Sequence, residues 1–228
     1  MESTDIRQYF LSYTGVLKIA KYRGYSVPDE RFMNIEEFTV KYAKYDDSNK
    51  LKEEMSGIIF EKEPPQKTPS DNQKGDVNAK IIVEWYSDKR IGIGIRDIVT
   101  KMEKEGIKNA LVVVDNNLTA GCRDMIKNIK STLHIIIDVW TLKESMIFVP
   151  DHVFVPKHRI CSIQESKAIC KAYGIKPNKN IKIDMLPHIK CDDVMVKYLG
   201  AKKGQLIEIT RASDTNPKLE IITYRLVV

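Results

Sequence analysis

Short apolar runs alternate with helix-like segments over residues 79–140, and this alternation restricts the possible folds more than any other feature of the chain. The apolar runs, typical of buried strands, are residues 81–86, 110–114 and 134–140, and the helix-like segments are residues 93–105 and 119–129. Strands and helices that alternate at this spacing form a mainly parallel sheet covered by helices. The sequence therefore predicts an α/β architecture here.

Two helices are predicted ahead of this sheet. Apolar side chains recur at steps of three and four residues over residues 6–20, which is typical of an amphipathic helix. Asn34 and Glu37 form a capping-box pattern at the start of a second helix. One face of that helix would be lined by Ile35, Phe38 and Tyr42. Residues 56–60 are a candidate strand, and residues 61–76 a polar, proline-rich loop.

The charge balance changes along the chain. Residues 1–150 hold 23 basic and 23 acidic side chains, whereas the remaining residues hold 14 basic and 8 acidic ones. Residues 147–156 contain two prolines and no helical period, so we place a domain boundary near Phe148. We expect an amino-terminal domain of residues 1–147 and a carboxy-terminal domain of residues 148–228.

The second domain is predicted to be a turn-rich mixed α/β module. A capping box at residues 162–165 opens one helix. Asp192 is the expected N-cap of a short second helix, and Gly200 suits the left-handed position that ends it. Residues 206–209 then form a strand. A final strand has an apolar end that offers an edge for pairing, through Ile221, Ile222, Leu226, Val227 and Val228.

Several uncommon dipeptides occur in order through this module. They are Val155-Pro156-Lys157-His158, Leu186-Pro187, Asp192-Asp193, Tyr198-Leu199-Gly200, Lys203-Gly204, Arg211, Ser213, Thr215 and Tyr224-Arg225. Together they resemble the assembly domain of the fifth subunit shared by the eukaryotic nuclear RNA polymerases, a domain that has a counterpart among the archaeal polymerase subunits. Three motifs further upstream resemble the jaw domain of the eukaryotic subunit. They are Arg23-Gly24-Tyr25, Val83-Glu84-Trp85 and Asn116-Asn117-Leu118-Thr119.

The resemblance implies both a fold and a function. The jaw of that family is a helix-covered mixed sheet of restriction-endonuclease type, and its assembly domain is a small mixed α/β (α+β) module. We therefore expect a non-catalytic subunit of a multisubunit DNA-directed RNA polymerase, without a cofactor. The carboxy-terminal domain would dock on the largest subunit of the polymerase core, and the jaw would contact downstream duplex DNA.

The family's motifs also imply which residues act. The expected subunit-assembly residues are Pro156, Lys157, His158, Pro187, Asp192, Asp193, Tyr224 and Arg225. The family's DNA-facing jaw loop is typically Thr-Pro-Ser, and this chain has Thr119, Ala120 and Gly121 there, so the proline is lost.

Phosphate contact at this loop also agrees with local chemistry, because backbone N–H groups at a helix start favour phosphate. Arg123 and Lys127 would add phosphate contacts, which position a protein without reading sequence. An ordinary capped helix start is the alternative. The neutral first domain predicts weak, non-specific DNA binding, since tight binding needs many neutralised phosphates.

A relict Mg²⁺-dependent nuclease is an alternative function. Restriction-type enzymes need an acidic residue and then Glu-x-Lys on the next strand, so that two carboxylates hold Mg²⁺ and the lysine steadies the attacking water. Asp76 and Glu84 are suitable residue types, but Tyr86 occupies the lysine position and carries no positive charge at neutral pH. We expect Glu84 to be a strand residue with a local partner.

A zinc-containing nucleic-acid-binding module is a second alternative. The pairs His158-x-x-Cys161 and His188-x-x-Cys191 have residue types that tetrahedral zinc accepts. Such mixed pairs arise easily by chance, however, and the family that the chain resembles carries no zinc. We therefore expect no metal, with core thiols and surface histidines instead.

Neither a membrane span nor a signal peptide is indicated. No apolar run approaches the roughly 20 residues needed to cross a bilayer, and the first residues lack a basic and an apolar region. We expect no membrane partner, and a reducing compartment for the four cysteines. The resemblance implies the nucleus for a cellular protein. A viral cytoplasmic factory or virion is the alternative for a viral one.

Overall fold

The computed structural model describes residues 3–42, 48–62, 80–86, 91–175, 186–213 and 219–228. The chain divides into two compact units, Met1–Ile147 and Phe148–Val228. Each unit combines helices with a mixed sheet, which confirms the predicted α/β (α+β) class. Within the described ranges, no helix has both the length and the apolar character needed to cross a membrane.

The sheet of the first unit has the strand order β1-β2-β3-β4. The strands are β1 (Ile58–Glu61), β2 (Lys80–Tyr86), β3 (Asn109–Val114) and β4 (Ile136–Thr141). β1 is antiparallel to β2, whereas β2, β3 and β4 are parallel, which confirms the predicted mainly parallel sheet. β4 begins later than predicted because His134 adopts a left-handed backbone (φ 55°) that ends the preceding helix.

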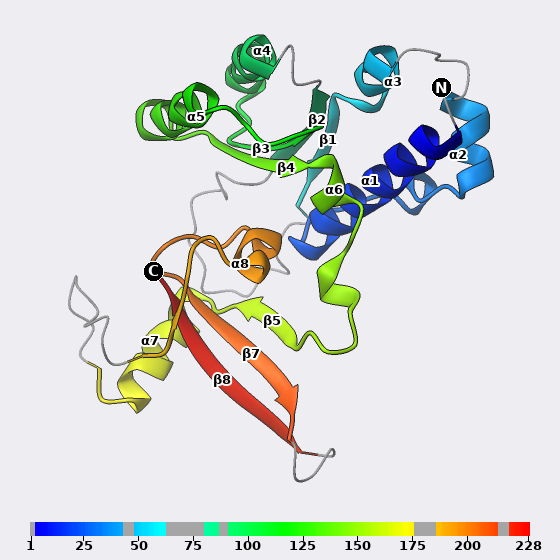
Figure 1. The fold of residues 1–228 in the computed structure, drawn as a ribbon. Coiled ribbons are helices and arrows are strands. Elements are labelled where there is room, and N and C mark those ends of the chain that lie inside the picture. Colours follow the sequence, from blue (N-terminus) through cyan, green and yellow to red (C-terminus); the bar gives the residue numbers. More distant parts are fainter. Residues whose placement is uncertain (1–2, 43–47, 63–79, 87–90, 176–185, 214–218) are drawn as a thin grey trace. The chain divides into compact units, whose positions relative to one another are not determined.

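Helices cover both faces of this sheet. Figure 1 shows α4 (Ile91–Glu105) and α5 (Ala120–Leu133) on one side, and α1 (Ser3–Tyr22) and α6 (Leu142–Ser145) on the other. Alternate side chains of each strand point to opposite faces, so the continuous apolar runs of the sequence fill both layers. The remaining helices of the unit are η1 (Asp29–Arg31), α2 (Ile35–Tyr42) and α3 (Ser48–Met55).

α1 is fixed to the sheet by a buried polar contact and a close backbone approach. Trp85 Nε1 donates a hydrogen bond to Ser12 Oγ at 3.2 Å, and the Ser12 and Ser145 hydroxyls lie 2.7 Å apart in the interior. A Cβ added at Gly15 would lie 1.8 Å from the Ser145 carbonyl oxygen. α1 and α6 can therefore meet at this point only because glycine has no side chain.

The predicted capping box of α2 is confirmed. Asn34 Oδ1 accepts a hydrogen bond from the Glu37 N–H, and Glu37 Oε2 accepts one from the Asn34 N–H. Phe38 and Tyr42 are buried against aromatic rings of α1. Ile35 shares the i, i+3, i+7 face of Phe38 and Tyr42, but it lies at the start of the helix and is 40% exposed.

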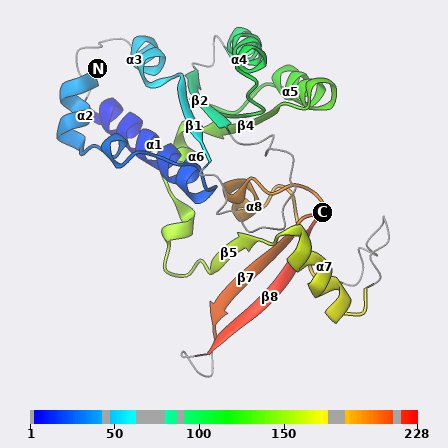
Figure 2. The same cartoon turned by 180° about the vertical axis from the view of Figure 1, so that it is seen from behind.

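The sheet of the second unit has the strand order β5-β7-β8-β6. The strands are β5 (Lys157–Ile160), β6 (His188–Ile189), β7 (Leu206–Ala212) and β8 (Glu220–Val227), and all pairs are antiparallel except β6 with β8. The far end of the β7–β8 ribbon extends away from α7 (Ile163–Ala172) and α8 (Val194–Leu199) (Figure 1, Figure 2).

Two small cores lie on opposite faces of this sheet. One contains Cys170 of α7 with Leu206 and Leu226, and the other contains Val196 of α8 with Ile207 and Val227. Leu206 and Ile207 are neighbours on β7, so their side chains point to opposite faces. The two central strands thus carry both cores, and η3 (Val149–Asp151) precedes them in the chain.

The helix starts of the second unit agree only partly with the sequence. The capping box at Ser162 and Glu165 is confirmed. Asp193, and not Asp192, caps α8, because its carboxylate accepts a hydrogen bond from the Met195 N–H at 2.8 Å while its own N–H closes a turn onto the Lys190 carbonyl. Gly200 ends α8 in the left-handed conformation (φ 64°), as predicted.

The free edge of β8 is shorter than the sequence indicated. Leu226 and Val227 are buried and pair with β6. The Val227 N–H points toward β7, where it donates to Gln205, and the Leu226 N–H points the other way, to Pro187. Backbone N–H and C=O groups point alternately to the two sides of a strand, so those of Ile222 and Tyr224 point away from β7, to the outer edge of β8. In the described ranges, no strand covers this part of the edge.

Replacing Gly15 by alanine should destabilise the first unit. The new methyl group would overlap the Ser145 carbonyl, and such overpacking costs about 1–3 kcal/mol. Thermal unfolding followed by tryptophan fluorescence reports on this unit, because both tryptophans, Trp85 and Trp140, lie in it. Gly92→Ala is the matched control, since open space surrounds Gly92 in α4. Equal melting temperatures for the two variants would contradict the close contact.

Candidate functional site

The expected assembly residues all lie in the second unit. Lys157 and His158 stand on β5, opposite Thr210 and Ile209 of β7, and His158 Nδ1 donates to the Pro156 carbonyl at 2.7 Å. The Pro187 carbonyl accepts from the Leu226 N–H, which places it beside the end of β8. Asp192 and Asp193 precede α8, while Tyr224 and Arg225 lie on β8 opposite Glu208 and Ile207. The structure thus forms two local groups, one at β5 and one at the β6–β8 end.

Arg159 is a further organising residue that the sequence did not reveal. Its guanidinium binds Glu208 on the neighbouring strand with two hydrogen bonds, of 2.8 and 2.7 Å, and also contacts Glu165 of α7. Hydrogen bonds from Arg159, and then from Ser162, lower the pKa of Glu165 to about 2. The Arg159–Glu165 ion pair therefore contributes its full stability at pH values above the ordinary pKa of a carboxyl group. This contribution is lost as the pH falls toward 2.

The proposed zinc ligands do not converge. Cys161 is buried in the core under α7, and burial is the main cause that raises the pKa of its thiol. His188 and Cys191 are exposed on and after β6. In the part of the chain that the structure describes, no three His, Cys, Asp or Glu side chains are placed to hold a metal ion. The geometry therefore gives the zinc hypothesis no support.

The expected DNA-contact residues form the exposed start of α5. Thr119 is its N-cap and accepts a hydrogen bond from the Cys122 N–H at 3.4 Å, so the helix start is capped. Ala120 and Gly121 are the first exposed residues of the helix. The Arg123 guanidinium folds back to donate to the Leu118 carbonyl. The Lys127 ammonium lies 3.5 Å from Asp124 and remains solvent-exposed.

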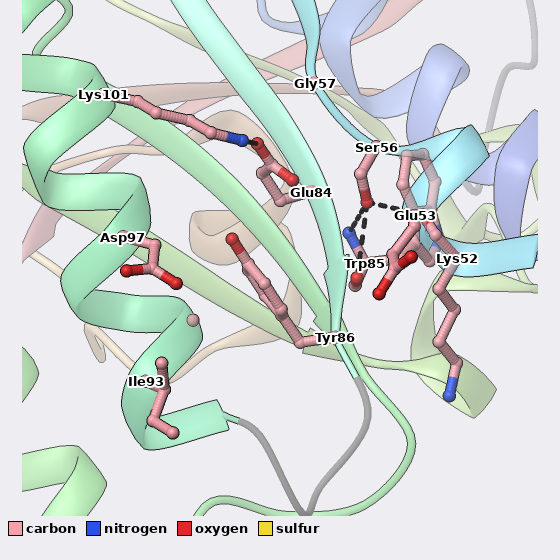
Figure 3. A pocket seen from close by; sticks show the side chains of 11 residues that line it. Lys52, Glu53, Ser56, Gly57, Glu84, Trp85, Tyr86, Ile93, Asp97 and Lys101 are labelled. Atoms are coloured by element: carbon pink, nitrogen blue, oxygen red, sulfur yellow. Dashed lines mark hydrogen bonds and ion pairs between the residues drawn. The ribbon is translucent and has the colours of Figure 1, made fainter. Parts of the chain in front are cut away.

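An open pocket of about 670 Å³ lies between β2, the end of α3 and α4 (Figure 3). Glu84 is almost fully buried, and Lys101 of α4 reaches it at 3.0 Å. The Tyr86 ring packs against Gly94 so closely that an added Cβ would lie 2.6 Å from it. Burial, followed by the charges of Glu84 and Asp97, raises the pKa of the Tyr86 phenol, so it stays neutral.

The carboxylates that line this pocket are Glu53, Glu84 and Asp97, and no three His, Cys, Asp or Glu side chains of the described residues are placed to hold a metal ion. Glu84 has the local partner expected of it, but that partner comes from α4 and not from its own strand. Sequence reasoning missed Lys101 because the two residues are 17 positions apart and meet only when α4 packs on the sheet. Asp76, the other proposed ligand, lies outside the described residues.

Comparisons with known proteins agree on one class. Residues 147–227 match the family described as RNA polymerase Rpb5, C-terminal domain. "DNA-directed RNA polymerases I, II, and III subunit RPABC1" of Caenorhabditis elegans is 26% identical over 216 residues, 93% of this chain and 92% of that one. "DNA-directed RNA polymerase subunit 5-like protein 1" of Arabidopsis thaliana is 26% identical over 98% of this chain and 97% of its own.

A shorter relative is more similar. "DNA-directed RNA polymerase subunit Rpo5" of Nitrosopumilus maritimus is 42% identical over 86 residues, which are 38% of this chain and 94% of that one. The matches thus define a class of protein, the subunits of DNA-directed RNA polymerases. Within that class, this chain belongs to the Rpb5 family, as its motifs indicated.

Removing the Lys101 ammonium should expose the cost of burying Glu84. Lys101→Met leaves a carboxylate that is only 3% exposed without its partner, and we expect a loss of about 1–3 kcal/mol. Tryptophan fluorescence during urea unfolding measures this loss, because Trp85 adjoins Glu84 in β2. Lys104→Met, at an exposed position of the same helix, is the control. Adding Glu84→Gln should restore part of the stability, and a Lys101 variant as stable as the control would contradict the pairing.

Proposed function

We propose that this chain is a non-catalytic subunit of a multisubunit DNA-directed RNA polymerase and acts in transcription. Membership of the Rpb5 family carries this proposal. The archaeal relative is hardly longer than the Phe148–Val228 unit, yet its name makes it a polymerase subunit. This supports the Phe148–Val228 unit as the assembly domain that docks on the largest subunit of the polymerase core.

The surface chemistry of the second unit supports a docking role. The unit has an excess of basic side chains, which suits an acidic protein surface. Arg211 and Arg225 are exposed on one face of the β7–β8 ribbon, without an ion-pair partner among the described residues. On the outer edge of β8, the backbone groups of Ile222 and Tyr224 have no strand partner among the described residues and could pair with an extended segment of the largest subunit. Pro156, Lys157, His158, Pro187, Asp192 and Asp193 complete the proposed assembly surface.

The Met1–Ile147 unit is proposed to be the jaw that contacts downstream DNA. Its contact residues would be Thr119, Ala120, Gly121, Arg123 and Lys127, which share the exposed start of α5. The charge balance of this part of the chain supports weak contact that does not depend on sequence. We place a cellular protein of this family in the nucleus, and a viral one in a cytoplasmic factory or the virion.

Affinity purification of the tagged full chain from its source tests the proposed function. The largest polymerase subunits should co-purify in stoichiometric amounts. A chain recovered only as a polymerase-free monomer would contradict the proposal.

The role of the β8 edge is tested by changing one residue in the same experiment. Ile222→Pro removes an outward N–H group while the pairing with β7 stays intact, so the amount of co-purified polymerase should fall by up to about tenfold. Ile222→Thr keeps the N–H group and serves as the control. Equal recovery with both variants would show that no strand pairs there.

The isolated protein should bind DNA weakly and in a salt-dependent manner. Fluorescence anisotropy with a labelled duplex should give a dissociation constant of about 1–100 μM at physiological salt, rising steeply with salt. Lys127→Gln should weaken binding further, because it removes an exposed cation beside the α5 start. Lys171→Gln in α7 is the control. Nanomolar affinity at physiological salt, or binding independent of salt, would contradict a weak jaw contact.

A further inference from the structure

Two adjacent side chains of the second unit, Val153 and Phe154, are exposed to an unusual degree. They are 87% and 88% exposed, more than any other large hydrophobic side chain in the described ranges. Single exposed apolar residues are normal on protein surfaces, but an adjacent pair that includes a whole aromatic ring indicates a contact site. We call these two residues the exposed pair.

The turn that carries the exposed pair is held by hydrogen bonds on both sides of it. The Val155 N–H donates to the His152 carbonyl at 2.9 Å, and the Phe154 N–H donates to His152 Nδ1 at 3.3 Å. Ahead of the turn, the Val149 N–H donates to the Tyr198 hydroxyl of α8 at 3.4 Å. Beyond it, β5 begins at Lys157 and pairs with β7.

These hydrogen bonds hold the backbone that carries the Phe154 ring, and the ring itself lies beside that of His152, with centroids 5.7 Å apart. A turn whose backbone is ordered before binding loses less conformational entropy on binding than a flexible one, so more of the burial of its side chains appears as affinity. Binding energy is also concentrated in a few large anchors that fill pockets on the partner. The exposed pair therefore has the properties of an anchor for a protein partner.

We propose that the exposed pair inserts into an apolar pocket of the largest polymerase subunit and anchors the second unit there. This inference rests on the proposed function and adds to it the residues that carry most of the binding energy. Only Val155 separates the pair from Pro156, Lys157 and His158, which belong to the proposed assembly surface. The exposed pair also lies in the Phe148–Val228 unit, which is similar in length to the whole archaeal subunit.

Competition for incorporation into the polymerase measures the contribution of Phe154. Differently tagged wild-type and Phe154→Ser full chains are expressed together in source cells, and the ratio of the two in purified polymerase is quantified. Loss of a buried aromatic ring should reduce incorporation about 10- to 100-fold. Phe154→Leu should retain most of it. Val40→Ser, at an 83% exposed position of α2 in the other unit, is the matched control and should incorporate like the wild type.

The possible outcomes separate this inference from the proposed function. Absence of the wild-type chain from the polymerase would overturn both. Equal incorporation of Phe154→Ser and the wild type would overturn only the anchor. A melting temperature several degrees lower for Phe154→Ser would mean that the free chain already covers the ring, and would overturn it too. The anchor would also fail if the free wild type were a dimer that Phe154→Ser converts to a monomer while incorporation stays unchanged.

Discussion

Burial of β2 and β3 on both faces is the constraint on which the first unit depends. From Ala110 to Val114 every side chain of β3 is buried, and β2 is buried from Ile81 to Trp85. A sheet with two apolar faces needs a layer on each, and the helices between parallel strands supply only one of them. The other layer comes from α1, the first helix of the unit, and from α6, the last. Contact between these distant helices is therefore required by the sheet.

The second unit uses the same principle on a smaller scale, and this leaves its edges for partners. Its central strands carry a core on each face, under α7 and under α8. With both faces occupied near those helices, the places that no other described element covers include the outer edge of β8, the far end of the ribbon and the turn before β5. Ile222 and Phe154 lie in these places, and both are at least half exposed. A compact module with two small cores thus keeps apolar residues at its margins, where another subunit can cover them.

Local signals in the sequence predicted most elements of both units, whereas pairings between distant residues were not predictable. The helices and parallel strands followed from periodicity, and capping boxes at Asn34 and Ser162 marked two helix starts correctly. Asp192 and Asp193 are adjacent and equally suited to cap a helix, and only the turn onto Lys190 decides between them. Neither the pairing of Glu84 with Lys101 nor the contacts of Arg159 with Glu165 and Glu208 has a local sequence pattern, because each forms only after two elements have packed together.

The contact between α1 and α6 also sets the order in which the first unit can fold. The hydroxyls of Ser12 and Ser145 are 133 positions apart in the sequence, so α1 and α6 can meet only after the whole chain segment between them has closed into a loop. The strands and helices between them pair with near neighbours along the chain, and such contacts form sooner. During synthesis α1 can therefore pack against α2 early, whereas its contact with α6 forms only after nearly the whole unit has left the ribosome.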